Sequence, residues 1–218
     1  MMMLTMTRPL AVLLACLVLA GCKFVPTAEK HKQASNNSAE ASDKGFDSKV
    51  AGMWETKVLP YAKAKAGNFA DVTAAITANA DAAGAKYGFR EKGGSAPWTL
   101  LSTISGKIVA ANTQSRAALI DVDTNGDGSA DAQVQIGPVI RGTAIRDSLD
   151  FVNFNDFTNQ IDFAQFGKAF NTHLNAKVLN TLPRENLVGK QAQVLGAFPL
   201  PAGAALPLVT PLTIEVTP

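Results

Sequence analysis

One long amphipathic helix, expected at residues 161–179, interrupts a segment that otherwise has the pattern of short β-strands. Its apolar side chains recur at helical spacing: Phe163, Phe166, Phe170, Leu174 and Val178. Asn159 precedes Asp162 by three residues, an order typical of a helix start. A helix of this length within a β-rich segment must bury its stripe against a sheet, which limits the folds that the segment adopts.

Strand patterns lie on both sides of this helix. Before it, we expect strands at residues 99–109 (with a bulge or bend at Gly106), 117–122 (as a continuation or restart), 132–136 and 139–145. After it, we expect strands at residues 190–198 and 212–216. Three strands, a helix and two strands form the order of an OB-like small β-barrel, an α+β fold. A generic sheet with helices on one face explains the same pattern.

The segment before the strands has helical periodicity. Apolar residues from Val50 to Tyr61 form one helix, which Pro60 should end or kink. Asn68 is a plausible cap for a second helix, and Gly88 suits its exit. We therefore expect a helical hairpin at residues 45–92, packed on a barrel domain at residues 93–218.

The amino-terminal residues predict export and a lipid anchor. Arg8 precedes an apolar stretch and then Leu19-Ala20-Gly21-Cys22, the order of a secretory signal that ends in a lipobox. The apolar stretch is about half of the roughly 20 residues that span a bilayer. We expect residues 1–21 to be removed, Cys22 to carry lipid, and residues 22–44 to form a flexible tether. An ordinary signal peptide with a chance cysteine is the alternative.

Composition narrows the location and the partners. Lys23 rather than Asp follows the lipobox cysteine, which slightly favours the outer membrane, on the periplasmic side. Cys16 lies in the expected signal, so the mature chain would have no disulfide. The net charge is +2 with 17% charged residues, which argues against nucleic acid as a partner.

Residues 121–131 form the sharpest local motif. Calcium loops place oxygen ligands at alternate positions with a glycine at the turn, and the candidate ligands are Asp121, Asp123, Asn125, Asp127 and Asp131. Neither register supplies the glutamate at the twelfth position, and strands flank the loop, so an EF-hand is excluded. A calcium-stabilised hairpin and a plain hairpin with an Asn-Gly turn both remain open.

A second polar constellation spans residues 137–160. Its candidate binding residues are Arg141, Arg146, Asp147, Asn155, Asp156 and Asn159. The arginines are suited to carboxylate or phosphate, and amides beside Phe154 and Phe157 resemble the lining of a sugar site. Alternatively, Arg146 pairs with Asp147 or Asp150, and the asparagines cap turns and the helix.

The sequence carries no nucleophile elbow, phosphate loop, dinucleotide fingerprint or zinc set. We therefore expect a protein that is not an enzyme. Asp147 and Asp156 keep one catalytic alternative open, because a carboxylate pair of suitable separation hydrolyses glycans.

Several runs of residues are similar to a known family. They are Asp121-Val-Asp, Gly126-Asp-Gly, the run from Gln135 to Asp147, the run from Phe154 to Gln160, Gly189-Lys190 and Gly196-Ala-Phe198. Over residues 45–218 the chain resembles the predicted periplasmic lipoproteins of domain of unknown function 2291. The resemblance implies lipid-anchored envelope proteins without an established activity, often encoded near sugar-uptake transporters. It carries over no catalytic residues.

We therefore expect a lipid-anchored envelope lipoprotein with a non-catalytic binding or accessory role. Its partners would be the membrane, through Cys22, and a small polar ligand or a component of a sugar-uptake transporter. The alternatives are an envelope glycan hydrolase and a structural lipoprotein with a calcium-stabilised hairpin.

Overall fold

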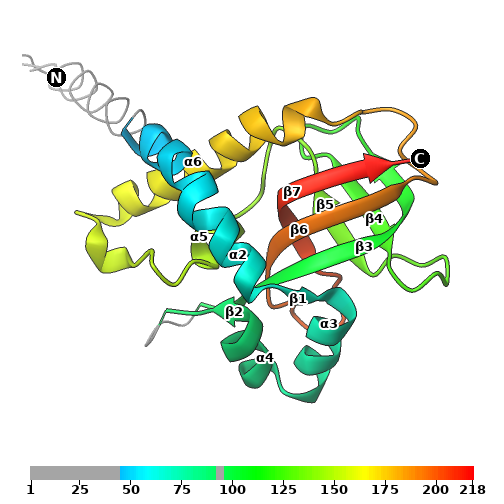
Figure 1. Cartoon of the computed structure of the whole chain (residues 1–218), viewed down its shortest axis with the longest axis horizontal. Helices are drawn as coiled ribbons and strands as arrows, with labels where there is room; N and C mark the ends of the chain where they lie inside the picture. Colours follow the sequence, from blue (N-terminus) through cyan, green and yellow to red (C-terminus); the bar gives the residue numbers. More distant parts are fainter. Residues whose placement is uncertain (1–44, 92–95) are drawn as a thin grey trace, which may run out of the picture.

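A five-stranded closed barrel forms the centre of the computed structural model, which describes residues 45–91 and 96–218 (Figure 1). Its strands are β3 (Thr99–Asn112), β4 (Leu119–Asp123), β5 (Ala132–Gln135), β6 (Gln191–Pro199) and β7 (Leu208–Thr217). They are ordered β3-β4-β5-β7-β6, and β6 pairs back with β3. Only the β5–β7 pairing within this barrel is parallel. This is the topology of an OB-type barrel, as the sequence predicts.

Alternating apolar residues fill the barrel interior. Ile104, Ile108, Ile120 and Val134 are each no more than 1% exposed. At Gly106 any Cβ atom would collide with the carbonyl of Asp123, so only glycine allows β4 to approach β3 here. The register of the β3–β4 ladder shifts between Ile108 and Ala110, close to the bulge expected at Gly106.

The prediction of a strand at residues 139–145 is wrong. Residues 137–143 are irregular and lead into the short helix α5 (Ala144–Asp147). Pro138 has no N–H for a ladder, and Gly142 has a φ of +80°, which extended strands do not adopt. The predicted count of three strands before the long helix is still correct, because residues 119–123 form a separate strand rather than a continuation of β3.

Helix α6 (Gln160–Lys177) lies between β5 and β6 in the chain and ends in a short 3-10 turn, η3 (Leu179–Thr181). Asn159 caps it by accepting hydrogen bonds from Ile161 N at 2.8 Å and Asp162 N at 2.9 Å. Its stripe is buried in a hydrophobic cluster outside the barrel, as the periodicity predicts: Phe166, Phe170 and Leu174.

The first helix does not end at Pro60. Residues 45–53 are helical and continue through a π-helical turn, η1 (Trp54–Val58), into α2 (Leu59–Lys65). Pro60 stands in the first turn of α2, where a missing N–H is tolerated, and the π-turn directly before it re-registers the backbone hydrogen bonds. Trp54, Val58 and Ala62 are buried in the same cluster as α6.

The second helical part is split in two, α3 (Phe69–Ala78) and α4 (Ala80–Tyr87). Asn68 caps α3, and Asn79 caps α4 by accepting from Ala82 N at 2.9 Å. Two-residue strands, β1 (Gly67–Asn68) and β2 (Gly88–Phe89), attach these helices to β3. Phe69, Val72 and Ala83 join the cluster that fills the barrel, so the helices before β3 contribute to two separate cores.

Of the helices in residues 45–91 and 96–218, none is long and apolar enough to cross a membrane. The expected signal peptide, the lipidation site Cys22 and the tether at residues 22–44 lie outside the described residues.

Candidate functional site

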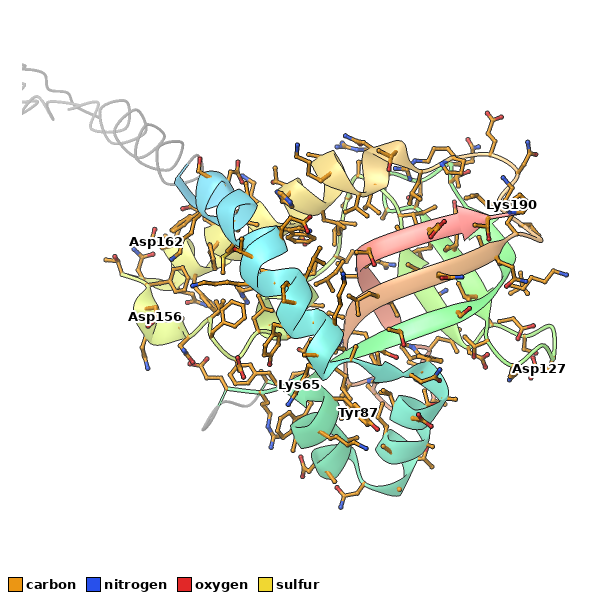
Figure 2. The ribbon with its side chains drawn as sticks, viewed as in Figure 1. Lys65, Tyr87, Asp127, Asp156, Asp162 and Lys190 are labelled. Atoms are coloured by element: carbon orange, nitrogen blue, oxygen red, sulfur yellow. The ribbon has the colours of Figure 1, made fainter. Side chains whose placement is uncertain are left out.

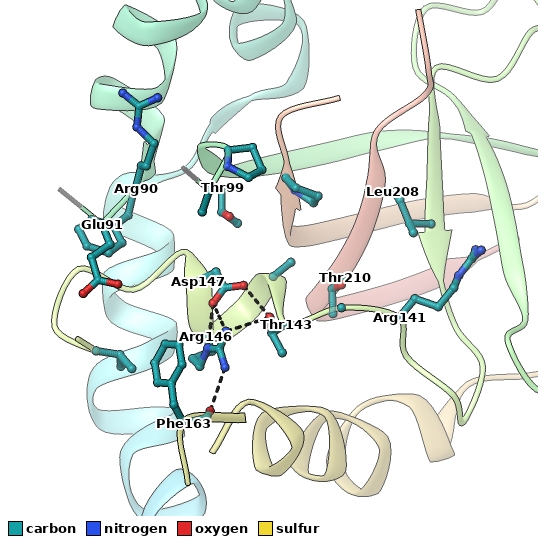
Figure 3. A pocket seen from close by; sticks show the side chains of 17 residues that line it. Arg90, Glu91, Thr99, Arg141, Thr143, Arg146, Asp147, Phe163, Leu208 and Thr210 are labelled. Carbon is teal, nitrogen blue, oxygen red and sulfur yellow. Dashed lines mark hydrogen bonds and ion pairs between the residues drawn. The ribbon is translucent and has the colours of Figure 1, made fainter. Parts of the chain in front are cut away.

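A cavity of about 440 Å³ lies at the end of the barrel where β3 and β7 begin and β6 ends. Residues of β2, α5 and the first turns of α6 form its other walls (Figure 3). About half of its lining side chains are apolar, among them Phe89, Val152, Phe163, Pro199 and Leu208. Pro199 and Leu208 flank the β6–β7 connection. In OB folds this connection, with the strand 1–2 loop, commonly contacts ligands.

Arg146 and Asp147 form the polar centre of the α5 wall. Arg146 donates from Nε at 2.8 Å and from Nη2 at 2.6 Å to Asp147 Oδ1. The hydroxyl of Thr143 donates to Asp147 Oδ2 at 2.6 Å. The ion pair is neutral as a whole, and each partner is held in one orientation.

Packing against α6 fixes Arg146 further. Its Nη1 donates to the carbonyl of Phe163 at 2.9 Å, and the guanidinium lies 3.7 Å from the centre of the Phe163 ring. Gly167 makes this approach possible, because a Cβ there would lie 2.9 Å from Nη1 of Arg146 and 2.7 Å from Cγ2 of Thr143. With its side chain only 10% exposed, Arg146 joins α5 to α6. The pairing with Asp147 that the sequence left as an alternative is the one observed.

Arg141 is placed differently. Its side chain is exposed, and within residues 45–91 and 96–218 no hydrogen bond or ion pair engages its guanidinium. Figure 3 shows the side chain directed away from the Arg146–Asp147 pair. Arg141 is therefore a cation at the edge of the cavity that remains available to a ligand.

Side chains from distant elements clamp the segment that carries Arg141. Gln135 accepts from Arg141 N at 2.8 Å and donates to Arg141 O at 3.1 Å. On α6, Asn171 donates to Gly142 O at 3.0 Å, and Asn175 donates to Pro138 O at 2.8 Å. These amides replace the strand ladder that residues 139–145 lack. Sequence reasoning missed Gln135, Asn171 and Asn175, because an isolated amide gives no spacing signal.

Two threonines on the barrel side of the cavity were also missed. Thr99, at the start of β3, is 4% exposed, and its hydroxyl has no hydrogen-bond partner among the described residues. Figure 3 shows this hydroxyl directed into the cavity. Thr210 in β7 is 1% exposed, and its hydroxyl accepts from Gln135 Nε2 at 2.9 Å. A threonine within a strand pattern looks like ordinary sheet composition, so no sequence signal marks either residue.

Asn155, Asp156 and Asn159 lie outside the cavity lining. Asp156 belongs to a 3-10 turn, η2 (Phe154–Asp156), where its carboxylate accepts from Asn153 N at 3.4 Å. Asn159 serves as the cap of α6. Asp156 is exposed, whereas Asp147 lines the cavity and is held by Arg146, so the geometry lends the proposed hydrolytic pair no support.

The carboxylates of the 121–131 loop accept hydrogen bonds from the loop itself. Asp123 accepts from the backbone N–H of Gly126 at 2.7 Å and of Gly128 at 2.8 Å. Asp131 accepts from Thr124 N at 2.7 Å and from the Thr124 hydroxyl at 2.6 Å. Gly126 and Gly128 have φ values of +84° and +87°, which the turn requires.

The remaining candidate ligands are also engaged locally. Asn125 accepts from Asp127 N at 2.8 Å, Asp127 from Ser129 N at 2.7 Å, and Asp121 from Gln133 Nε2 at 3.0 Å. Hydrogen bonds from Gly126 and Gly128 lower the pKa of Asp123. Within the part of the chain that the structure describes, no three His, Cys, Asp or Glu residues are grouped so as to hold a metal ion. The calcium site stays a prediction, and the geometry favours the plain hairpin.

Comparison with known proteins supports the same class of fold. The structure is similar to the crystal structure of an OB-fold protein from Thermotoga maritima, with a TM-score of 0.62 and 18% sequence identity. The match covers 79% of this chain and 98% of that one. No curated protein matches the chain.

The protein is thus an OB-type barrel with added helices, and its family is shown by its sequence. The profile described as predicted periplasmic lipoprotein, domain of unknown function 2291, matches residues 12–215. The chain belongs to this family, as the resemblance in its central motifs implies.

Proposed function

We propose that this protein is a non-catalytic binding lipoprotein of the bacterial envelope, and that the cavity beside α5 holds a small polar ligand. The cavity is the observation that carries this proposal. Its volume of about 440 Å³ falls within the range of ligand sites, and it adjoins the β6–β7 connection. Most of its lining surface is apolar, and polar side chains surround it, a combination found in ligand sites.

The proposed membrane anchor is more specific than the periplasmic lipoprotein that the family description gives. We infer that Cys22 carries lipid and that the anchor lies in the outer membrane, because Lys23 rather than Asp follows it. An accessory role beside a sugar-uptake transporter rests on the genomic association that the family resemblance implies, and not on the cavity.

Mass spectrometry of the protein extracted from bacterial membranes tests the anchor. The mature amino terminus should be an acylated Cys22, and Cys22→Ser should release the protein from the membrane fraction. An unmodified terminus, or recovery of the wild type from the cytosol, would contradict the anchor without touching the cavity.

A thermal-shift screen of sugars, organic acids and amino acids tests the binding role on the mature chain. A ligand of the cavity should raise the melting temperature of the wild type and of the exposed-surface control Arg116→Ala, but much less that of Arg141→Ala. The binding role fails if no compound acts, or if every compound acts equally on the three proteins.

A further inference from the structure

Most charges around the cavity are already neutralised. Arg146 and Asp147 cancel each other through hydrogen bonds of 2.6 and 2.8 Å. Arg90 forms an ion pair with Asp81 at 3.4 Å and lies over the ring of Trp98. Neither pair offers a net charge to a ligand, so the sign of the ligand's charge depends on the other charged lining residues.

The two remaining charged lining residues lie apart. Arg141 and Glu91 both have no partner within the described chain, and Figure 3 shows them on opposite sides of the cavity. The Arg141 side of the cavity is therefore electropositive. An exposed arginine changes rotamer readily, so its guanidinium reaches a ligand at this edge at little cost.

A hydrogen-bond donor lies close to Arg141. Gln135 Nε2 donates both to Thr210 Oγ1 at 2.9 Å and to Arg141 O at 3.1 Å, so one nitrogen connects the two residues. Because the Thr210 oxygen accepts this bond, its own proton is left to donate. This side of the cavity thus offers a hydroxyl donor and, when the Arg141 side chain turns inward from the direction that Figure 3 shows, a guanidinium, a pair suited to a carboxylate.

The opposite part of the barrel wall offers Thr99. The residue is buried, and its hydroxyl is directed into the cavity and unpartnered in the described residues (Figure 3). Among the described residues the Thr99 oxygen is not one of the buried side-chain atoms that lack a partner, so it is accessible from the cavity and free to bond a ligand. The apolar lining includes Leu208, on the Arg141 side, and Phe163, beside Arg146 (Figure 3).

We propose that the cavity takes a small hydroxylated organic acid. Its carboxylate lies between Arg141 and Thr210, its apolar body lies against the apolar lining that includes Leu208 and Pro199, and its hydroxyl group bonds with Thr99. This inference rests on the proposed binding function, because it names the ligand class of the same cavity.

Titrations of the mature chain with three matched probes, followed by the amide NMR signals of Thr99 and Thr210, test the ligand class. 4-Hydroxybenzoate should bind most tightly. Replacing the carboxylate by an amide, in 4-hydroxybenzamide, should weaken binding about tenfold or more, and removing the hydroxyl, in benzoate, about threefold to tenfold.

Two variants assign the groups. Arg141→Gln should abolish the preference for the acid over the amide, whereas the matched surface variant Arg116→Gln should keep it. Thr99→Val should abolish the preference for 4-hydroxybenzoate over benzoate. The same variant should leave the melting temperature of the ligand-free protein close to that of the wild type, because the Thr99 hydroxyl has no hydrogen-bond partner among the described residues. Replacement of a hydroxyl that stabilises the fold through a hydrogen bond would lower it instead.

Specific results would overturn the proposal. If methyl α-glucopyranoside shifts the Thr99 and Thr210 signals and the acids do not, the ligand class is wrong but the binding function stands. Equal binding of acid and amide to the wild type, or a Thr99→Val protein less stable than the wild type, would also overturn it.

Discussion

The 121–131 loop and the 136–147 segment are both dense in polar residues, yet they are held in opposite ways. Figure 2 places Asp127 of the loop at one end of the molecule and Asp156, which follows the segment, at the other. The side-chain hydrogen bonds within the loop join residues at most seven apart, such as Thr124 and Asp131. The segment depends on side chains from β5 and α6. The loop, whose polar groups bond to one another, forms a turn. The segment, which is held by side chains of other elements, leaves groups such as Arg141 available to a ligand.

The largest effect is expected for Arg146→Ala. The change removes the bonds that join α5 to α6 and leaves Asp147 without its cation, so we expect a loss of about 2–3 kcal/mol in the free energy of unfolding, since Asp147 is partly exposed. Urea denaturation measures it. Arg116→Ala, on the surface, should change stability by less than about 0.5 kcal/mol. Equal effects of the two variants would refute the structural role of Arg146.

Gly167→Ala should disturb the same wall more mildly. The added methyl group would meet Thr143 and Arg146 at 2.7 and 2.9 Å. The strain outweighs the better helix propensity of alanine, and we expect a net loss of about 1 kcal/mol. Gly52→Ala is the matched control, because Gly52 is helical and no atom lies within 4 Å of the position that its added methyl group would take. Measured by urea denaturation, Gly52→Ala should leave the free energy of unfolding unchanged or increase it. A loss as large as that of Gly167→Ala would contradict the crowding argument.

The loop should respond to acid. Its folded geometry lowers the pKa of Asp123, so the stabilisation is fully present above the pKa of the unfolded chain and is lost as the pH falls through the lower pKa of the folded state. The protection factors of the Gly126 and Gly128 amides, which correct for the intrinsic pH dependence of amide exchange, should fall over that pH range. In Asp123→Asn these amides should exchange faster at neutral pH and depend less on acid. Unchanged acid dependence in the variant would rule out Asp123 as the cause.

Calcium should have the smallest effect. Because the loop's own donors already engage its carboxylates, calcium at about 1 mM, compared with chelator, should shift the melting temperature by less than about 1 °C. A larger shift that Asp131→Asn abolishes would restore the calcium-stabilised hairpin and weaken the contrast between the two regions.

Strong periodic signals made the fold predictable. The Phe stripe of α6 and its cap Asn159 were readable because both depend on residues close in sequence. Pro60 does not end the first helix, because the π-turn directly before it, which the residue pattern does not reveal, accommodates it. Residues 139–145 misled because apolar content was mistaken for a strand, although Pro138 and Gly142 disfavour one.

The site was less predictable, because its geometry depends on contacts between distant residues. Arg141, Arg146 and Asp147 line the cavity as a dense polar run suggested. Thr99 and Thr210 are more than 100 residues apart in the chain, and only the closure of the barrel brings them to one cavity. No local sequence pattern predicts that these two side chains line the same cavity.

The helix at residues 45–65 has a mechanical consequence. Its Trp54 ring lies 4.6 Å from His173 and 6.4 Å from Phe170, both on α6. Helix α6 also holds the Arg141 segment through Asn171 and Asn175. A force applied at the amino end of this helix would therefore act on α6 and on the cavity wall that α6 supports, as well as on β3, with which α2 is in contact.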